Sequence, residues 1–142
     1  MKYRQKDINL NIGVGKPRKL TYHIFEEPAV NTFNEELARE YAKHYRLVDK
    51  MVLEVKPLSE ILDDYMPKNT DIDFMNIDVE GMDLEVLESN DWYKYRPKII
   101  LVEVLNISSI EDIIKHEITM FLRKKGYALF AKSFNTCFFK ER

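Results

Sequence analysis

Two apolar runs flank a helical segment in the middle of the chain, and this arrangement constrains the fold more than any other feature. Residues 74–79 and 99–104 each have the pattern of a strand, and the second is an almost unbroken run of branched aliphatic residues. Such runs are typical of parallel strands that are covered on both faces. Residues 80–89 between them have the apolar spacing of a helix. The segment therefore predicts a βαβ unit with two central, parallel strands.

Shorter elements are expected on both sides of this unit. Further strands are predicted over residues 8–14, 20–25, 51–55, 127–131 and 137–139, the last two as an antiparallel hairpin. Pro57 precedes a brief helix at 58–65. The whole pattern is that of an α/β domain.

Two capping boxes predict where further helices begin. Thr32 with Glu35 places one start near Phe33, and Ser108 with Glu111 opens a long helix. That second helix is expected to end at the basic residues before Gly126, because cations suit the negative end of a helix and glycine adopts its stop conformation easily.

The composition fits one globular domain, residues 1–142, and excludes several classes. The chain is 45% hydrophobic, and its 22 basic and 24 acidic residues are mixed along the sequence, so no basic stripe for nucleic acid is present. The single cysteine, Cys137, has no disulfide partner. No leader pattern is seen, and no run reaches the roughly 18 apolar residues of a membrane span. We therefore expect a cytoplasmic protein with no nucleic-acid partner and no membrane span.

Three acidic residues lie where the two strands of the βαβ unit end. They are Asp78 and Glu80 on the first strand and Glu103 on the second. Ligands of open parallel sheets collect beyond the carboxyl ends of the strands. Carboxylates at neighbouring strand ends can bind a ligand rich in donors, hold a cation, or act as a general base whose pKa is raised by burial and by the other acids.

A plainer interpretation of the first two acids stays open. Asp78 would cap the following helix and Glu80 would complement its dipole, without any catalysis. Glu103 is harder to explain in this way, because a lone acid in an apolar strand needs a partner, and we expect it to organise a site.

Other motifs do not favour a site. Gly13 and Gly15 form a GxG, but a strand follows instead of the helix that a nucleotide loop requires. Asp71 and Asp73 form a DxD, which would suit a metal-dependent glycosyltransferase, but the pair precedes its strand and is expected in a solvated loop. The three histidines and Cys137 lack the spacing of metal ligands, so no metal site is predicted.

The order of three motifs resembles the FkbM methyltransferase domain. The motifs are DFMNIDVEG at residues 73–81, LEVL at 84–87 and PKIILVE at 97–103. Residues 121–127 with Phe130 are similar to the closing segment of that family. The resemblance covers most of the chain from Asn9 onward.

The resemblance implies a fold and a reaction. The fold would be part of a Rossmann-like class I methyltransferase sheet, mostly parallel with a C-terminal antiparallel hairpin and with helices on both faces. Strands 74–79 and 99–104 would be the fourth and fifth, the hairpin the sixth and seventh, and the strand ending at Gly13 the third. The cofactor would be S-adenosylmethionine, and the acceptor a hydroxyl of a sugar or small metabolite.

The resemblance also assigns site residues. Asp78 and Glu80 would be catalytic, and Glu103 would bind the acceptor or organise the site. The family's first strand and glycine-rich cofactor loop have no counterpart here, so the cofactor-binding residues are unknown and the domain is expected to be truncated or degenerate. An exposed sheet edge would then favour a homo-oligomer. The alternative function is a non-catalytic interaction domain that keeps the sheet without the cofactor site.

Overall fold

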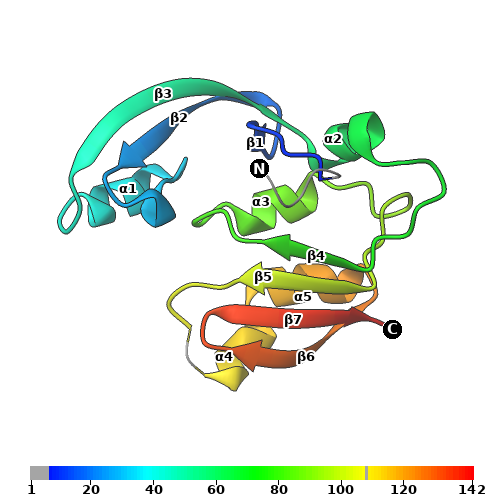
Figure 1. Ribbon diagram of the computed structural model, residues 1–142. Coiled ribbons are helices and arrows are strands. Elements are labelled where there is room, and N and C mark those ends of the chain that lie inside the picture. Colours follow the sequence, from blue (N-terminus) through cyan, green and yellow to red (C-terminus); the bar gives the residue numbers. More distant parts are fainter. Residues whose placement is uncertain (1–6, 108) are drawn as a thin grey trace.

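The computed structural model describes residues 7–107 and 109–142, which form two β-sheets with helices packed around them (Figure 1). The strands are β1 (Gly13–Val14), β2 (Arg18–Phe25), β3 (Leu47–Lys56), β4 (Phe74–Ile77), β5 (Ile99–Glu103), β6 (Tyr127–Ser133) and β7 (Thr136–Glu141). The helices are α1 (Glu35–Tyr41), α2 (Leu58–Tyr65), α3 (Asp83–Glu88), α4 (Ile110–Lys115) and α5 (Glu117–Lys124), with one 3-10 turn, η1 (Pro28–Val30).

The second sheet contains the predicted βαβ unit and has the strand order β4-β5-β7-β6. β4 and β5 are parallel, with Ile77 opposite Val102, and α3 connects them as expected. β6 and β7 form the predicted antiparallel hairpin, with β7 beside β5. β5 is therefore an inner strand, whereas β4 lies at an edge of the sheet and not at its centre as predicted.

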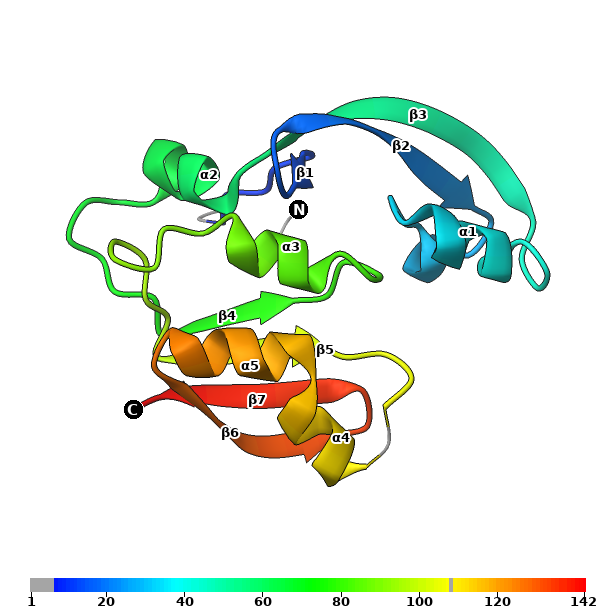
Figure 2. The ribbon, with the colours of Figure 1, turned by 180° about the vertical axis from the view of Figure 1, so that it is seen from behind.

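One face of this sheet carries the main core. Ile100, Val102 and Phe139 are fully buried and pack with Leu87 of α3 and Leu122 of α5. Figure 2 shows α5 lying across this face. On the other face, Phe74 is 65% and Phe130 55% exposed. The expectation of helices on both faces is therefore wrong for this sheet, because α3, α4 and α5 all contribute to one core cluster.

The first sheet has the order β1-β3-β2, in which β1 is parallel and β2 antiparallel to β3. The expected single, mostly parallel sheet is thus replaced by two mixed sheets. Long local pairing explains the difference, since β2 and β3 match from Arg18 opposite Val55 to Phe25 opposite Leu47. The predicted strand at 8–14 shrinks to Gly13–Val14 because its apolar residues stay exposed, Ile8 by 60%.

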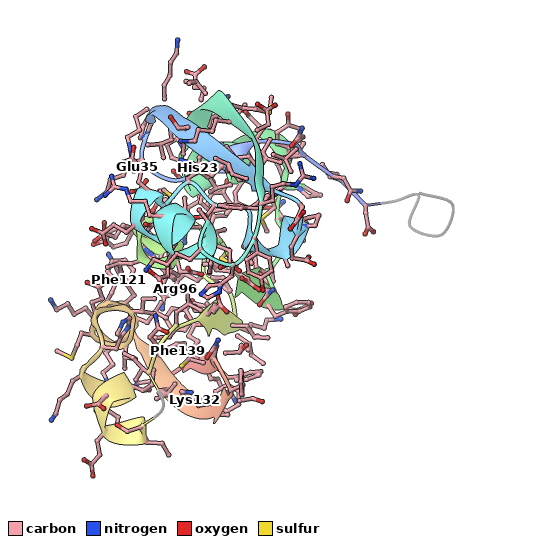
Figure 3. All side chains as sticks on the ribbon, turned by 90° about the vertical axis from the view of Figure 1, so that its left-hand side faces the viewer. His23, Glu35, Arg96, Phe121, Lys132 and Phe139 are labelled. Atoms are coloured by element: carbon pink, nitrogen blue, oxygen red, sulfur yellow. The ribbon has the colours of Figure 1, made fainter. Side chains whose placement is uncertain are left out.

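β2, α1 and β3 form a protruding unit that we call the arm (residues 18–56). In Figures 1 and 2 its strands arch away from the second sheet, and α1 lies beneath the far end, facing the loop that follows β4. Figure 3 gives the side view, with His23 and Glu35 in the arm and Phe139 and Lys132 in the lower part. The fold thus places a helix opposite the carboxyl end of β4.

Two predicted helix starts differ from the structure. α1 is capped by Asn34, whose side chain accepts hydrogen bonds from the amides of Glu36 and Leu37, and not by Thr32. Ser108, the expected cap of the next helix, lies outside the described residues, and within them Ser109 caps α4. The long helix predicted there is broken at His116, which has an extended backbone and caps α5.

Other predictions are confirmed. α2 spans Leu58–Tyr65 after Pro57, and Gly126 adopts a φ of 91° after α5. In the part of the chain that is described, no helix has both the length and the apolar character that crossing a membrane requires.

Candidate functional site

The three predicted acids meet at the carboxyl ends of β4 and β5. Asp78 follows Ile77, Glu103 ends β5, and the register of the parallel pair brings them side by side. One carboxylate oxygen from each of Asp78, Glu80 and Glu103 lies within 4.8 Å of the others. Asp78 is exposed, whereas Glu80 and Glu103 are partly buried. We call these three residues the acidic cluster.

Glu103 is the most perturbed member of the cluster. Burial is the largest cause that raises its pKa, and the negative charges of Asp78, Glu80 and Asp83 add to it, whereas a hydrogen bond with the Asn135 side chain opposes them; together they bring the pKa to about 7. Its Oε2 atom is buried without a hydrogen-bond partner among the described residues. A carboxyl group with this pKa exchanges protons near neutral pH, as a general base requires.

Asp83, the first residue of α3, is a fourth acid that sequence reasoning did not single out. It is only 5% exposed, and burial raises its pKa to about 6. Backbone amides, including that of Gly81, bind its carboxylate and limit this rise. The only sequence signal was its place near a predicted helix start, which indicates a dipole contact and not burial beside the cluster.

The helix-capping interpretation of Asp78 is not supported. The residue at the N-cap of α3 is Met82, and no side chain makes the capping hydrogen bond. The chain instead turns sharply before the helix, with φ of 50° at Glu80 and 89° at Gly81. Left-handed backbone is costly for a residue with a side chain, so surrounding contacts must hold Glu80 in place.

Those contacts come from the arm. The Thr32 hydroxyl donates to the backbone oxygen of Glu80 at 2.8 Å, and the Asn34 side-chain amide donates to that of Gly81 at 3.4 Å. The Tyr41 hydroxyl donates to Oε2 of Glu80 at 2.6 Å. Burial and this hydrogen bond raise the pKa of Tyr41 above its usual range. None of these partners was predicted, because they lie 39 to 48 residues away in sequence.

A cavity of about 500 Å³ lies between the arm and this turn. The turn after β4 lines one side with Asp78, Val79, Glu80 and Met82, residues 11–14 line another, and the arm supplies the rest. The lining residues from the arm are Tyr22, Pro28, Ala29, Asn31, Thr32, Phe33 and Leu53. Glu103 is not part of the lining, although one of its carboxylate oxygens lies within 4.8 Å of those of Asp78 and Glu80.

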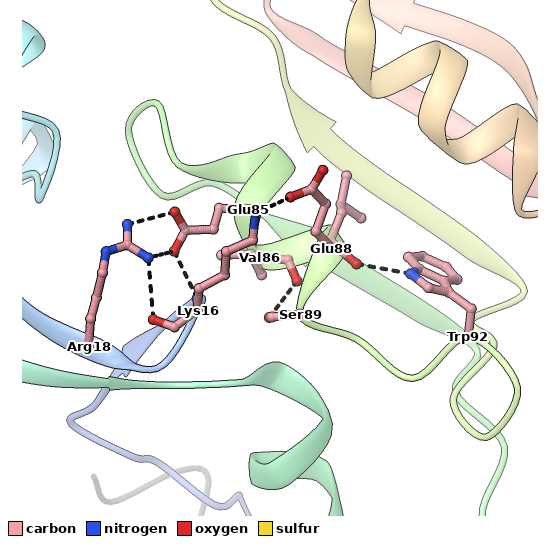
Figure 4. Close-up of polar contacts among 8 residues, drawn as sticks. Lys16, Arg18, Glu85, Val86, Glu88, Ser89 and Trp92 are labelled. Carbon is pink, nitrogen blue, oxygen red and sulfur yellow. Dashed lines mark hydrogen bonds and ion pairs between the residues drawn. The ribbon is translucent and has the colours of Figure 1, made fainter.

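Ion pairs fix the base of the arm to α3, as Figure 4 shows. Arg18 binds both carboxylate oxygens of Glu85, at 2.6 and 2.7 Å, and Lys16 pairs with Glu88 at 2.7 Å. Partial burial opposes the ionisation of Glu85, but its hydrogen bonds with Arg18 and with the Lys16 amide outweigh burial and lower its pKa. The base of the arm is therefore anchored to α3.

The other residues that the sequence offered as site candidates lie outside the acidic cluster or have a different role. Asp71 and Asp73 are exposed beyond the opposite end of β4 and pair with Lys98. Gly13 lines the cavity, but β2 follows Gly15 and no helix N-terminus faces a ligand there. Trp92 is buried and donates to the backbone oxygen of Leu87, so its packing role is confirmed.

The arrangement supports more than one kind of chemistry. Three carboxylate oxygens so close together match the ligands of a divalent cation, and within the described residues no other group of histidine, cysteine or acidic side chains has comparable geometry. The same carboxylates can accept protons or hydrogen bonds from a ligand in the cavity.

Comparison with known proteins identifies the family. No curated protein and no solved structure matches the chain. The model of the methyltransferase FkbM domain matches residues 1–129, which is most of the sequence and includes the acidic cluster. The chain therefore belongs to the FkbM methyltransferase family.

Proposed function

We propose that this chain takes part in S-adenosylmethionine-dependent methyl transfer to a hydroxyl group of a sugar or small metabolite. One observation carries the proposal: two acids from the strand end, Asp78 and Glu80, line a cavity, and a third, Glu103, has a pKa of about 7 and a carboxylate oxygen within 4.8 Å of theirs. Methylation of a hydroxyl releases a proton, and such a cluster can accept it.

The charge of the cavity fits the cofactor's reactive end. Among the described residues that line it, two are acidic and none is a lysine, arginine or histidine. Carboxylates favour a positive centre, and S-adenosylmethionine, when bound, supplies a methyl group on a positively charged sulfur. We assign only this methyl-proximal end of the cofactor site to the chain.

The side chains take distinct roles. Asp78 and Glu80 accept hydrogen bonds from the acceptor hydroxyl and orient its oxygen, since both face the cavity. When bound, S-adenosylmethionine would supply the methyl group to this oxygen, and the acidic cluster would accept the hydroxyl proton. Glu103 is suited to retain that proton, because its pKa lies close to neutral pH.

The same lining favours neutral acceptors. A phosphate or carboxylate on the acceptor would be repelled by Asp78 and Glu80 and would find no cationic partner among the described lining residues. We therefore expect sugars and other hydroxyl compounds without anionic groups to be the better substrates.

Two measurements test the function. Calorimetry with S-adenosylmethionine, on this chain and on a version extended upstream, measures cofactor binding. Transfer of a radiolabelled methyl group to a panel of neutral and phosphorylated sugars then measures turnover. We expect Asp78→Asn to lower turnover roughly 100-fold or more, as the loss of a group that handles the proton does.

Asp71→Asn is the matched control, because it makes the same substitution beyond the other end of β4. It should leave turnover within about twofold, as expected for an exposed acid away from the site. Absence of cofactor binding by both chain lengths would contradict the methyltransferase function and favour a non-catalytic interaction domain.

A further inference from the structure

Among the described residues, Tyr41 makes the one hydrogen bond that joins a side chain of the arm to a carboxylate of the acidic cluster. Its hydroxyl lies 2.6 Å from Oε2 of Glu80, and Glu80 itself has a strained backbone with φ of 50°. Tyr41 is the last residue of α1, and its ring packs edge-on against Phe25 of β2 and Tyr45. The phenol is thus held by the arm and points to a carboxylate that lines the cavity.

The surrounding contacts hold α1 in place on the turn, and with it the two groups of this hydrogen bond. Thr32, which is 1% exposed, and Asn34 bind the backbone oxygens of Glu80 and Gly81. Leu37 of α1 lies directly over Gly81, where a Cβ would stand only 2.6 Å from its Cδ1 atom. At the other end, the pair of Arg18 with Glu85 anchors the arm to α3. α1 therefore cannot slide along the turn without breaking several contacts.

The carboxylate of a long side chain can adopt several rotamers. Holding it in the one rotamer that faces a ligand therefore costs conformational entropy. One short, charge-assisted hydrogen bond is enough to select a rotamer while leaving the second oxygen available. In Glu80 the bonded atom is Oε2, so Oε1 is left for a ligand.

We propose that Tyr41 is a positioning residue that holds the Glu80 carboxylate at the wall of the cavity, beside Glu103. The catalytic consequence of this role rests on the function proposed above, but the positioning itself does not. Removing the phenol hydroxyl should free Glu80 to turn toward solvent and away from Glu103.

The pKa of Glu103 depends on the position of the Glu80 carboxylate. The charged groups that act on Glu103 are Asp78 and Glu80 after β4 and Asp83 of α3, with the neutral Asn135 side chain from the β6–β7 turn and the Tyr41 phenol from α1. The charge of Glu80 contributes to the raised pKa of Glu103, so moving that charge away should lower the pKa below its value of about 7.

The test follows the carboxyl carbons by NMR in chain labelled with ¹³C-glutamate, over pH 4 to 9 and without any ligand. The resonance that disappears in Glu103→Gln identifies Glu103. Glu80→Gln should lower its titration midpoint, and Tyr41→Phe should move the midpoint in the same direction. Tyr45→Phe is the control, since its ring packs beside Tyr41 but its hydroxyl has no hydrogen-bond partner among residues 7–107 and 109–142.

The outcomes separate the positioning role from the proposed function. A lowered midpoint in Tyr41→Phe with an unchanged one in Tyr45→Phe supports the role, whether or not the chain transfers methyl groups. If the midpoint in Tyr41→Phe equals that of the wild type while Glu80→Gln lowers it, Tyr41 does not position Glu80. If Glu80→Gln also leaves it unchanged, Glu80 does not stand beside Glu103, and the proposal fails. In an active chain, Tyr41→Phe should lower kcat about tenfold with KM nearly unchanged.

Discussion

Gly81 lies so close to Leu37 that a Cβ on the glycine would stand 2.6 Å from the Leu37 Cδ1 atom. Gly81 also has a φ of 89°, which residues with side chains rarely adopt. Gly81→Ala should therefore lower the free energy of unfolding by about 2–4 kcal/mol, through backbone strain and overpacking together. Urea denaturation measures this change.

Two companion variants separate the strain from the overpacking. In a Leu37→Ala background, the cost of Gly81→Ala should fall by ~1 kcal/mol or more, because the closest clash is removed while the strain and the 3.1 Å approach to Asn34 Nδ2 stay. Gly126→Ala is the control for strain alone, since Gly126 has a φ of 91° and its Cβ would meet only the end of the Arg96 side chain, at 3.3 Å. Equal costs for the two glycine variants would contradict close packing of α1 on the turn.

The raised pKa of Glu103 predicts how stability depends on pH. Its pKa is about 7 in the folded chain and 4.5 for an ordinary glutamate, so the folded chain binds the proton more tightly than the unfolded chain. Stability should therefore fall as pH rises from about 4.5 to about 7, and the loss should persist above that range.

Glu103→Gln cannot ionise and should escape this loss. Relative to the wild type, its free energy of unfolding should gain ~1–2 kcal/mol between pH 4.5 and pH 8, a figure reduced for partial exposure to solvent. Glu54→Gln, at an exposed position of β3, serves as the control and should follow the wild type. Parallel pH profiles for wild type and Glu103→Gln would show that Glu103 is not perturbed.

The pair of Arg18 with Glu85 should couple the arm to α3 measurably. Both terminal nitrogens of the guanidinium bind the carboxylate, and the side chain of Glu85 is only 20% exposed. A double-mutant cycle with Arg18→Ala and Glu85→Ala should give a coupling of about 1 kcal/mol that weakens in 1 M salt. The exposed pair of Arg39 with Glu35 in α1 should give less than about 0.5 kcal/mol, and a similar value for both pairs would argue against the anchor.

Self-association through the exposed edge stays a prediction. β4 is an edge strand of the second sheet, and its Phe74 is 65% exposed. Strand edges with apolar side chains favour pairing with another chain. Sedimentation over a range of concentrations should show a dimer that Phe74→Lys weakens, and a monomer at every concentration would contradict the prediction.

Much of the candidate site was predictable from the sequence because it depends on local order. The acids at 78, 80 and 103 follow apolar strands, and parallel neighbours align their carboxyl ends, so their meeting follows from the βαβ unit alone. Asp83 was not predictable, because its 5% exposure depends on the turn at Glu80 and Gly81 that folds over it.

Sequence patterns could not predict which residues of the arm bind the turn at Glu80. Thr32 has the spacing of a helix cap with Glu35, yet its hydroxyl binds the backbone of Glu80, 48 residues away, and Asn34 makes the cap. Both residues are suitable caps by propensity, and only the docking of α1 on the turn decides between them.

The sequence by itself determined the family, the βαβ unit, the terminal hairpin and the three acids at the strand ends. These features follow from short-range periodicity and from the order of the motifs, and both can be recognised without the tertiary structure. Only the tertiary structure decided that β1, β2 and β3 form a separate sheet, that α1 returns to the acidic turn, and that Tyr41 binds Glu80. The physical reason is that contacts between distant segments stabilise the long antiparallel pair and the docked helix. Local sequence patterns do not indicate the free energy of such contacts.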